Sequence, residues 1–122
     1  MDNLIEEKCF DFSLKIISLS RNLNEEKKEY VIAKQLLRSG TSIGANVAEA
    51  QYAQSEADFI SKNSIALKEA AETHYWLRLL ESCDFMSESE VDELILKCAE
   101  LKRILNAIVR SSKKKYRMVT NT

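Results

Sequence analysis

The residues best suited to chemistry lie close together in one stretch of the chain. Glu69, Glu72 and His74 could supply general acids and bases or hold a metal ion. Their spacing matches neither the Glu-x-x-His motif of di-iron helical bundles nor a multi-histidine site, because His74 is the only histidine. No nucleophile, oxyanion donor or cofactor motif accompanies the two carboxylates. We therefore expect no catalytic residue, no metal, no cofactor and no small-molecule substrate.

Two other groups that could take part in chemistry also favour structural roles. Cys9, Cys83 and Cys98 are odd in number and unclustered, so we expect reduced, mostly buried thiols rather than a disulfide or a metal site. Gly40 and Gly44 could cradle a phosphate, but this segment has no Walker spacing and no preceding strand. Close approach of a neighbouring helix is the simpler explanation for both glycines.

The elements that position these residues are predicted to be helices. The chain has 122 residues, no Pro and two Gly, with 45% hydrophobic and 30% charged residues. This composition excludes collagen-like, disulfide-rich and disordered classes. Apolar residues recur at steps of three and four, the spacing of one helix face. We predict helices at about residues 3–23, 25–53, 56–82 and 88–115, with a basic tail over 113–122.

Apolar lines and capping residues define the predicted helices. Three helix starts are expected at Asn24, at Ser55 with Asp58, and at Ser87 with Glu90. The predicted core lines are Ile5, Cys9, Phe12, Ile16, Leu19 and Leu23; Ala33, Leu37, Gly40, Gly44 and Val47, flanked by Ile32, Leu36 and Ile43; Phe59, Ala66, Ala70, Thr73, Leu77 and Leu80; and Val91, Leu94, Ile95, Cys98, Leu101, Leu105 and Ile108.

The connections between these helices are short, which favours antiparallel neighbours. We therefore predict an all-α fold, in which residues 1–122 form one antiparallel up-down-up-down, left-handed four-helix bundle. No apolar run approaches the length needed to cross a bilayer, and the first ten residues lack the pattern of a signal peptide. The expected location is the cytoplasm, without membrane contact.

Two of the predicted helices carry a second line of residues facing away from the core. We call these the outer lines: Val31, Gln35, Arg38, Ser42, Ala45 and Glu49 on one helix, and Ile65, Glu69, Glu72, Trp76 and Leu79 on the next. Antiparallel pairing places Arg38 level with Glu69. A lone bundle cannot cover both faces of the third helix, so another copy of the chain is expected to cover the outer line. Alternatively, Trp76 and Leu79 shield the edge of a monomer. A partial outer line on the first helix comprises Phe10, Leu14 and Ile17.

The positions of the charged residues are more informative than their sum. The 18 basic and 19 acidic residues give a formal net charge of −1, which provides no global attraction for nucleic acid. Acids dominate residues 84–100, and bases follow. One explanation is that acids match the start and bases the end of a helix dipole. The alternative is a basic patch that contacts phosphates and stacks on a base, formed by Arg110, Lys113, Lys114, Lys115, Tyr116 and Arg117.

Two segments resemble a known family. Residues 35–50 resemble the signature R-x-x-x-S-I-x-x-N-[IV]-A-E of 23S rRNA-intervening sequence proteins, and residues 58–77 resemble a second block of one branch of that family. The resemblance covers nearly the whole chain. It implies a left-handed four-helix bundle that assembles as a ring, commonly a pentamer, with no known enzymatic activity. Carried over to matching positions, the residues expected to hold the bundle or ring together are Arg38, Ser42, Asn46, Glu49, Glu69, Glu72 and Trp76.

Two functions follow as hypotheses. The first is a non-catalytic, homo-oligomeric scaffold or adaptor, expected to be a pentamer whose main partner is itself. The alternative is a nucleic-acid-binding accessory protein, for example to a reverse transcriptase, that uses the basic C-terminal end to bind RNA or DNA. It arises because the accessory variability determinant of diversity-generating retroelements, a related branch, resembles this chain in fold and binds a reverse transcriptase and nucleic acid through a basic surface.

Overall fold

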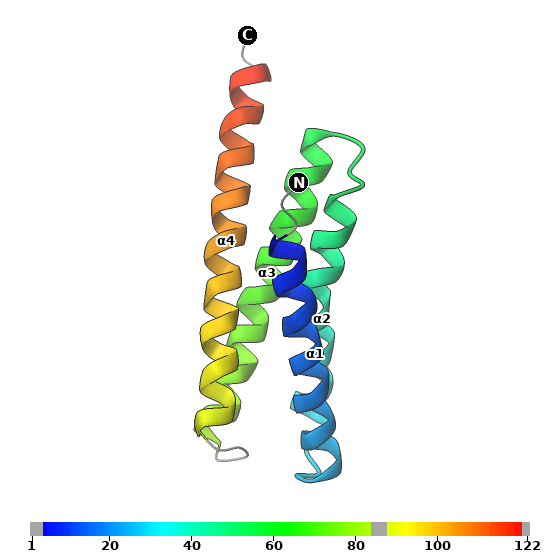
Figure 1. Cartoon of the computed structure of the whole chain (residues 1–122), viewed down its shortest axis with the longest axis vertical. Coiled ribbons are helices and arrows are strands. Elements are labelled where there is room, and N and C mark those ends of the chain that lie inside the picture. The colour runs from blue at the N-terminus through cyan, green and yellow to red at the C-terminus, as the bar shows by residue number, and fades with distance from the viewer. Residues whose placement is uncertain (1–3, 84–87, 121–122) are drawn as a thin grey trace.

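Four helices make up the computed structural model, which describes residues 4–83 and 88–120. They are α1 (Leu4–Glu25), α2 (Val31–Ala50), α3 (Glu56–Ser82) and α4 (Glu88–Thr120). Figure 1 shows the helices side by side along one long axis, with successive helices running in opposite directions. The predicted all-α four-helix fold is confirmed. The left-handed twist and the extent of the single domain stay predictions.

Ion pairs show how α1 is aligned with α4. Lys8 Nζ lies 3.2 Å from Glu100 Oε2, and Lys15 Nζ lies 3.5 Å from Glu93 Oε1. The residue numbers therefore fall along α4 as they rise along α1, and the two partners add up to 108 in both pairs. This register places Leu4, the first residue of α1, level with Ile104. α1 and α4 nevertheless pack less extensively than the other neighbouring helices.

The two glycines of α2 allow α1 to approach closely. A Cβ atom on Gly40 would lie 2.8 Å from Ile16 Cγ2, and one on Gly44 would lie 3.2 Å from Cys9 Cβ. Neither glycine has a positive φ, so space rather than backbone conformation requires them. The predicted role of both glycines in helix contact is confirmed.

The second helix begins later than predicted, because α1 continues through Asn24. The chain then turns at Lys28, whose φ of 55° is left-handed, and the Glu29 N–H donates to the Leu23 carbonyl at 2.9 Å. Glu29 Oε1 accepts the hydrogen bond of the Ile32 N–H at 2.5 Å. The prediction of Asn24 as N-cap is therefore wrong, since a side chain five residues later fills the acceptor role at this helix start.

The remaining helix ends differ less from expectation. α2 ends at Ala50 rather than residue 53. Ser55 caps α3 as predicted, with its side chain accepting from the Asp58 N–H at 3.0 Å. The predicted cap at Ser87 lies outside the described residues. α4 remains helical through Thr120, so the segment predicted to be a tail is part of this helix as far as the structure describes it.

The core follows the predicted lines, with local corrections. Leu37 is exposed and Gly44 and Phe59 are half-buried, contrary to the prediction for these positions. The buried side of α2 instead runs through Leu36 and Ile43, because packing against both α1 and α3 rotates the line by one residue. On α4, Val109 replaces Ile108 in the core. No helix in the described part of the chain is long and apolar enough to cross a membrane.

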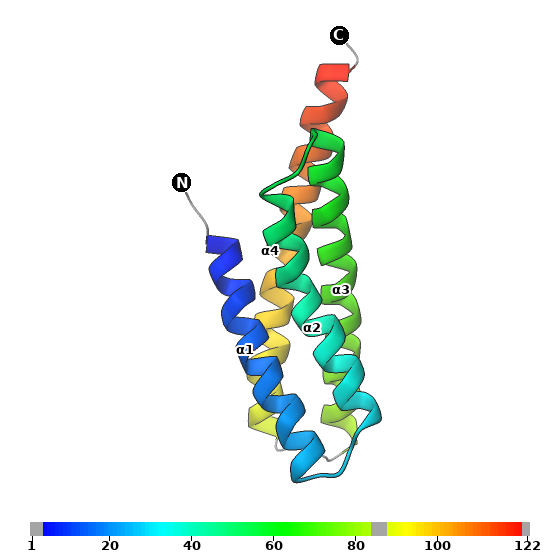
Figure 2. The ribbon, with the colours of Figure 1, turned by 90° about the vertical axis from the view of Figure 1, so that its right-hand side faces the viewer.

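α4 continues beyond the part that packs against the neighbouring helices. Val109 is the last buried residue of the described part of α4, and residues 110–120 are exposed except for half-buried Ser112. Figures 1 and 2 show this end of α4, coloured red, continuing straight beyond the connection between α2 and α3. We call residues 110–120 the α4 extension.

The glycine contacts predict unequal effects of adding one methyl group. Each Gly→Ala change gains up to about 1 kcal/mol of helix propensity. At Gly40 the new methyl group would overlap the buried Ile16 side chain, and overpacking of this kind costs about 1–3 kcal/mol. We expect Gly40→Ala to lower the free energy of unfolding by about 1 kcal/mol and Gly44→Ala to change it by less than about 0.5 kcal/mol. Urea denaturation at fixed protein concentration measures both, and a Gly40→Ala variant as stable as wild type would contradict the close contact.

Candidate functional site

The carboxylates that first suggested chemistry form a cluster between α2 and α3. Arg38 Nη1 lies 3.2 Å from Glu69 Oε2, and Arg38 Nη2 donates to Glu72 Oε2. Trp76 Nε1 also donates to Glu72 Oε2, at 2.9 Å, and Arg38 Nε donates to Gln35 Oε1 at 3.3 Å. The predicted level pairing of Arg38 with Glu69 is confirmed. We call these five residues the arginine cluster.

Every carboxylate of the arginine cluster is therefore engaged by a guanidinium. The Arg38 side chain is 48% exposed, so solvent screens its ion pairs and they add little to stability. A guanidinium held by two carboxylates has strict geometry, however, which fixes the register of α2 against α3. Farther along the same pair of helices, Lys62 Nζ lies 3.2 Å from Glu49 Oε1. The arrangement is suited to positioning helices rather than to proton transfer.

Two residues of the family signature bond within their own helix. Ser42 Oγ donates to the Arg38 carbonyl at 2.6 Å, and Asn46 Nδ2 donates to the Ser42 carbonyl at 2.9 Å. Both side chains are half-buried on α2. The structure therefore brings Arg38, Glu69, Glu72 and Trp76 together, whereas the side-chain bonds of Ser42 and Asn46 stay on the backbone of α2.

The outer line of α3 is only partly open. Trp76 is half-buried, packs against the core and meets Tyr75 edge to face, with ring centroids 5.2 Å apart. Leu79 is also half-buried, whereas Ile65 is 41% exposed. Trp76 and Leu79 are thus covered in part by their own chain. The subunit-contact role of the outer lines stays a prediction.

Sequence reasoning missed a buried polar contact beneath the arginine cluster. Ser39 and Thr73 are fully buried, and the Thr73 hydroxyl lies 2.9 Å from Ser39 Oγ. Ser39 was overlooked because it is a polar residue. Its position, three residues after Leu36 and four before Ile43, places it on the buried line of α2. This contact joins α2 to α3 in the interior.

The surroundings of His74, Cys9 and Cys98 shift their pKa values. Burial lowers the pKa of His74, and the positive charges of Lys102 and Arg78 lower it further. Burial raises the pKa of the Cys9 and Cys98 thiols to about 12. Among residues 4–83 and 88–120, no three His, Cys, Asp or Glu side chains are grouped to hold a metal ion. The expectation of mostly buried thiols holds for these two cysteines, while Cys83 is exposed.

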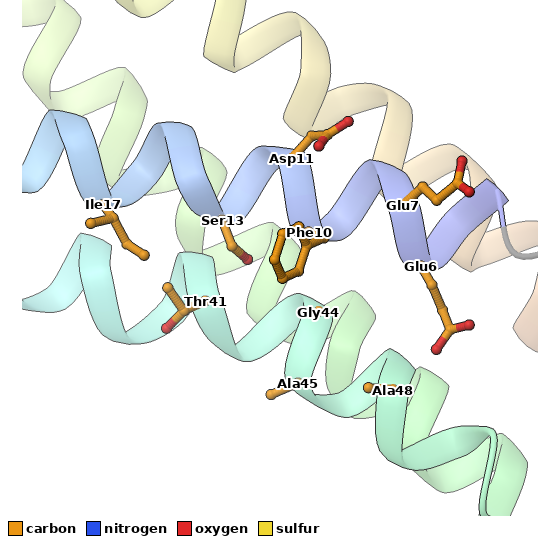
Figure 3. Close-up of a pocket in the computed structure, with 10 residues that line it drawn as sticks. All are labelled: Glu6, Glu7, Phe10, Asp11, Ser13, Ile17, Thr41, Gly44, Ala45 and Ala48. Atoms are coloured by element: carbon orange, nitrogen blue, oxygen red, sulfur yellow. The ribbon is translucent and has the colours of Figure 1, made fainter.

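A groove runs along the outer side of α1 and α2. Figure 3 shows the Phe10 ring at the groove beside Gly44, with Glu6, Glu7 and Asp11 carried by the same stretch of α1. Its volume is about 810 Å³. We call it the α1–α2 groove, and its lining residues are Glu6, Glu7, Phe10, Asp11, Ser13, Ile17, Thr41, Gly44, Ala45 and Ala48. Sequence reasoning identified Phe10 and Ile17 as outward-facing but did not find the groove.

The predicted basic patch lies on the α4 extension. Arg110, Lys113, Lys114 and Arg117 are three or four residues apart, so they share one exposed helix face. Lys115 is also exposed, and Tyr116 is 39% exposed. None of the ion pairs found among the described residues involves these cations. The patch is thus presented on a helix rather than on an irregular tail.

The thiol environments predict selective modification. At pH 8 a thiol with a pKa of about 12 is thiolate in only about one molecule in ten thousand, and burial also blocks access. We expect an aromatic disulfide reagent to modify one thiol per native chain, Cys83, and all three thiols after denaturation. Prompt reaction of two or three thiols in the native protein would contradict the burial of Cys9 and Cys98.

Comparisons with known proteins agree with the sequence signature. The family model described as 23S rRNA-intervening sequence protein matches residues 1–107. A crystal structure from Bacteroides thetaiotaomicron, described as a protein of unknown function from the S23 ribosomal protein family, is 44% identical to the chain. The match covers 87% of this chain and 98% of that one, with a TM-score of 0.85. No curated protein matches the chain. The chain belongs to the family of 23S rRNA-intervening sequence proteins.

Proposed function

We propose that the chain is a non-catalytic, homo-oligomeric scaffold or adaptor subunit of the cytoplasm. The expected number of copies is the five that the family resemblance implies. The observation that carries this proposal is the apolar surface of α1, where the Phe10 side chain is 66% exposed and Leu14 is 51% exposed. These two side chains are four residues apart and therefore lie on one helix face.

Exposed apolar side chains on one face favour association. A large aromatic group that stays in water loses the free energy that its burial would release, and aromatic anchors dominate many subunit interfaces. Phe10 lies beside the α1–α2 groove, so a partner that covers the ring also fills this hollow (Figure 3). We place the apolar centre of the proposed interface on α1 rather than at Trp76, because Trp76 already packs against the core of its own chain.

The outer lines of α2 and α3 supply the polar part of the proposed interface. Arg38 of the arginine cluster is half in solvent, and Val31 on α2 and Ile65 on α3 are exposed members of the same outer lines. Interfaces commonly combine an apolar centre with a rim of paired charges. In this proposal the arginine cluster aligns α2 and α3 and borders the contact with the neighbouring copy.

The non-catalytic part of the proposal is supported by the state of the candidate groups. Glu69 and Glu72 are both paired with Arg38, and the buried thiols are protonated at neutral pH. Neither the family description nor the structure from Bacteroides thetaiotaomicron names a catalytic activity. Binding and assembly are therefore the proposed uses of the surface.

Replacing the apolar face of α1 with charges should separate the copies. We expect wild type to have a mass several times the 14.0 kDa of one chain, and the Phe10→Glu, Leu14→Glu double variant to be a folded monomer. The matched control is Tyr52→Glu, because Tyr52 is 88% exposed in the connection after α2 and does not line the α1–α2 groove. Size exclusion with light scattering gives the mass, and circular dichroism verifies the helices.

Each result decides a separate part of the proposal. A wild-type monomer would contradict the homo-oligomer. An assembled double variant would contradict α1 as the apolar centre. A monomeric Ile65→Glu variant would support the contribution of the outer line of α3, because Ile65 lies outside the core.

A nucleic-acid-binding accessory is the second candidate. The observation that favours it is the α4 extension, which presents four cations on one exposed face, and residues 101–120 include no acid. Closely spaced cations on a helix can neutralise phosphates and release counterions. Tyr116 could stack on a base beside them.

Neutralising this face should weaken RNA binding and its dependence on salt. We expect the Lys113→Gln, Lys114→Gln, Arg117→Gln variant to bind single-stranded RNA more weakly, with a salt slope smaller by about 2, since each lost phosphate contact removes about 0.7. The control changes three exposed bases at the far end of the bundle, Arg21→Gln, Lys27→Gln and Lys34→Gln. Fluorescence anisotropy at several salt concentrations measures both slopes, and equal slopes would count against the α4 extension as the RNA site.

A further inference from the structure

We infer that a pocket on the second half of α3, beside α4, binds the phosphate group of a small ester. The binding residues are His74, Arg78 and Ser82 on α3, together with Lys102 on α4. None of them belongs to the arginine cluster, the α1–α2 groove or the α4 extension. This binding requires neither the proposed assembly nor the proposed RNA site.

The pocket has a volume of about 360 Å³. This volume falls within the range of small-ligand sites, about 300–1,000 Å³. The lining residues lie on one side of α3, because they recur at three- and four-residue spacing. They are Ala71, His74, Tyr75, Arg78, Leu79 and Ser82. Four of these six side chains can donate a hydrogen bond and none is an acid, so the pocket is suited to an anion.

Lys102 adds a positive charge from α4 beside this pocket. Figure 1 shows the second half of α3 next to the first half of α4, and the Cys98 thiol donates to the Ala70 carbonyl at 3.2 Å. Lys102 lies one turn beyond Cys98 on that side of α4. Burial lowers the pKa of His74, and the charges of Lys102 and Arg78 lower it further. Basic side chains from two helices therefore converge here.

These two cations have no acidic partner in the part of the chain that the structure describes. None of the ion pairs there involves Arg78 or Lys102. Both charges act instead on the His74 ring, whose protonated form they disfavour. An anion that binds between the cations would offset both charges at once.

Three acids lie near this pocket along the chain or by helix register, namely Glu72, Glu81 and Asp92. Glu72 is held by Arg38, and Glu81 has an interaction of its own. Asp92 lies near this level of α3 by the antiparallel register of α4. None of the three is among the charges that shift the pKa of His74. The positive charge of the pocket is therefore open to a ligand.

A phosphate ester matches the donors of the pocket better than a carboxylate does. It carries a charge of about −1.5 to −2 at pH 7 and three strong acceptor oxygens. The Arg78 guanidinium can engage two of these oxygens side by side, which leaves the third for the His74 ring and the Ser82 hydroxyl. The Tyr75 side chain is 57% exposed and offers a flat apolar surface to the organic part of the ester.

Phosphate binding and protonation of His74 should strengthen each other. Burial and two nearby cations lower the pKa of the ring in the ligand-free chain. A bound dianion offsets these cations and accepts a hydrogen bond from the protonated ring, so it raises that pKa. By reciprocity, the protonated ring favours the bound anion. The ring therefore reports on occupancy of the pocket.

Proton NMR of this ring tests the site, because His74 is the only histidine and its signals identify it without ambiguity. The probes are adenosine monophosphate and inorganic phosphate, with adenosine as the uncharged control, at an ionic strength held at about 0.15 M with sodium chloride. We expect both phosphate probes to shift the ring signals to saturation and to raise the pKa of His74, and adenosine to do neither. Because Tyr75 contacts the ester, adenosine monophosphate should bind about threefold or more tightly than inorganic phosphate.

A neutral variant assigns the binding to this pocket. Arg78→Gln should raise the dissociation constant of adenosine monophosphate about tenfold or more, since it removes the paired donors. It should also raise the pKa of His74 without ligand, because one of the nearby positive charges is gone. The matched control, Arg117→Gln, removes the same charge about 22 Å along α4 from Lys102 and should change neither quantity. Thermal melting verifies that both variants are folded.

Each result decides a stated part of the inference. Ring signals that neither phosphate probe moves would overturn the site, as would equal affinities of wild type and Arg78→Gln for adenosine monophosphate. An equal response to adenosine would overturn phosphate as the recognised group. Equal affinities of wild type for the two phosphate probes would support the phosphate site and overturn the contact of the ester with Tyr75. The oligomeric state is measured separately, so failure of this site leaves the proposed assembly unaffected.

Discussion

The contact between α1 and the glycine face of α2 is the constraint on which the rest of the structure depends. Without a side chain at Gly40, α2 accepts Ile16 of α1 almost against its backbone. This approach buries the inner face of α1. The α1–α2 groove lies beside Gly44, because the small residues of α2 do not fill the space under Phe10. Gly44 therefore takes part both in the close contact with α1 and in the lining of the groove.

The contact between α2 and α3 gives the chemically suggestive residues structural partners. Ser39 and Thr73 meet in the interior, and Arg38 holds Glu69 and Glu72 at the surface above them. A buried hydroxyl pair and a forked ion contact both demand strict geometry, so together they fix the register of two long helices. The signature residues Arg38, Glu69 and Glu72 therefore align α2 with α3.

Much of the fold could be predicted because helical periodicity and capping are local properties. The glycine contact and the pairing of Arg38 with Glu69 also followed from the sequence, since antiparallel pairing fixes which residues are level. The start of α2 and the burial of Leu36 instead of Leu37 could not, because adjacent helical positions satisfy the same pattern and only packing against two neighbours chooses between them. The α1–α2 groove was missed because a hollow depends on two helices at once.

The central claim is that the apolar surface of α1 left open by one chain is covered by other copies, and amide hydrogen exchange of α1 at several protein concentrations tests it most directly. Phe10 and Leu14 are exposed in the single chain. Because a copy that covers this face suppresses local opening of α1, we expect the amides around Phe10 to exchange slowly at high protein concentration and faster on dilution, while the α4 core around Leu101 stays protected throughout. Exchange around Phe10 that is equally fast at every concentration would contradict the claim.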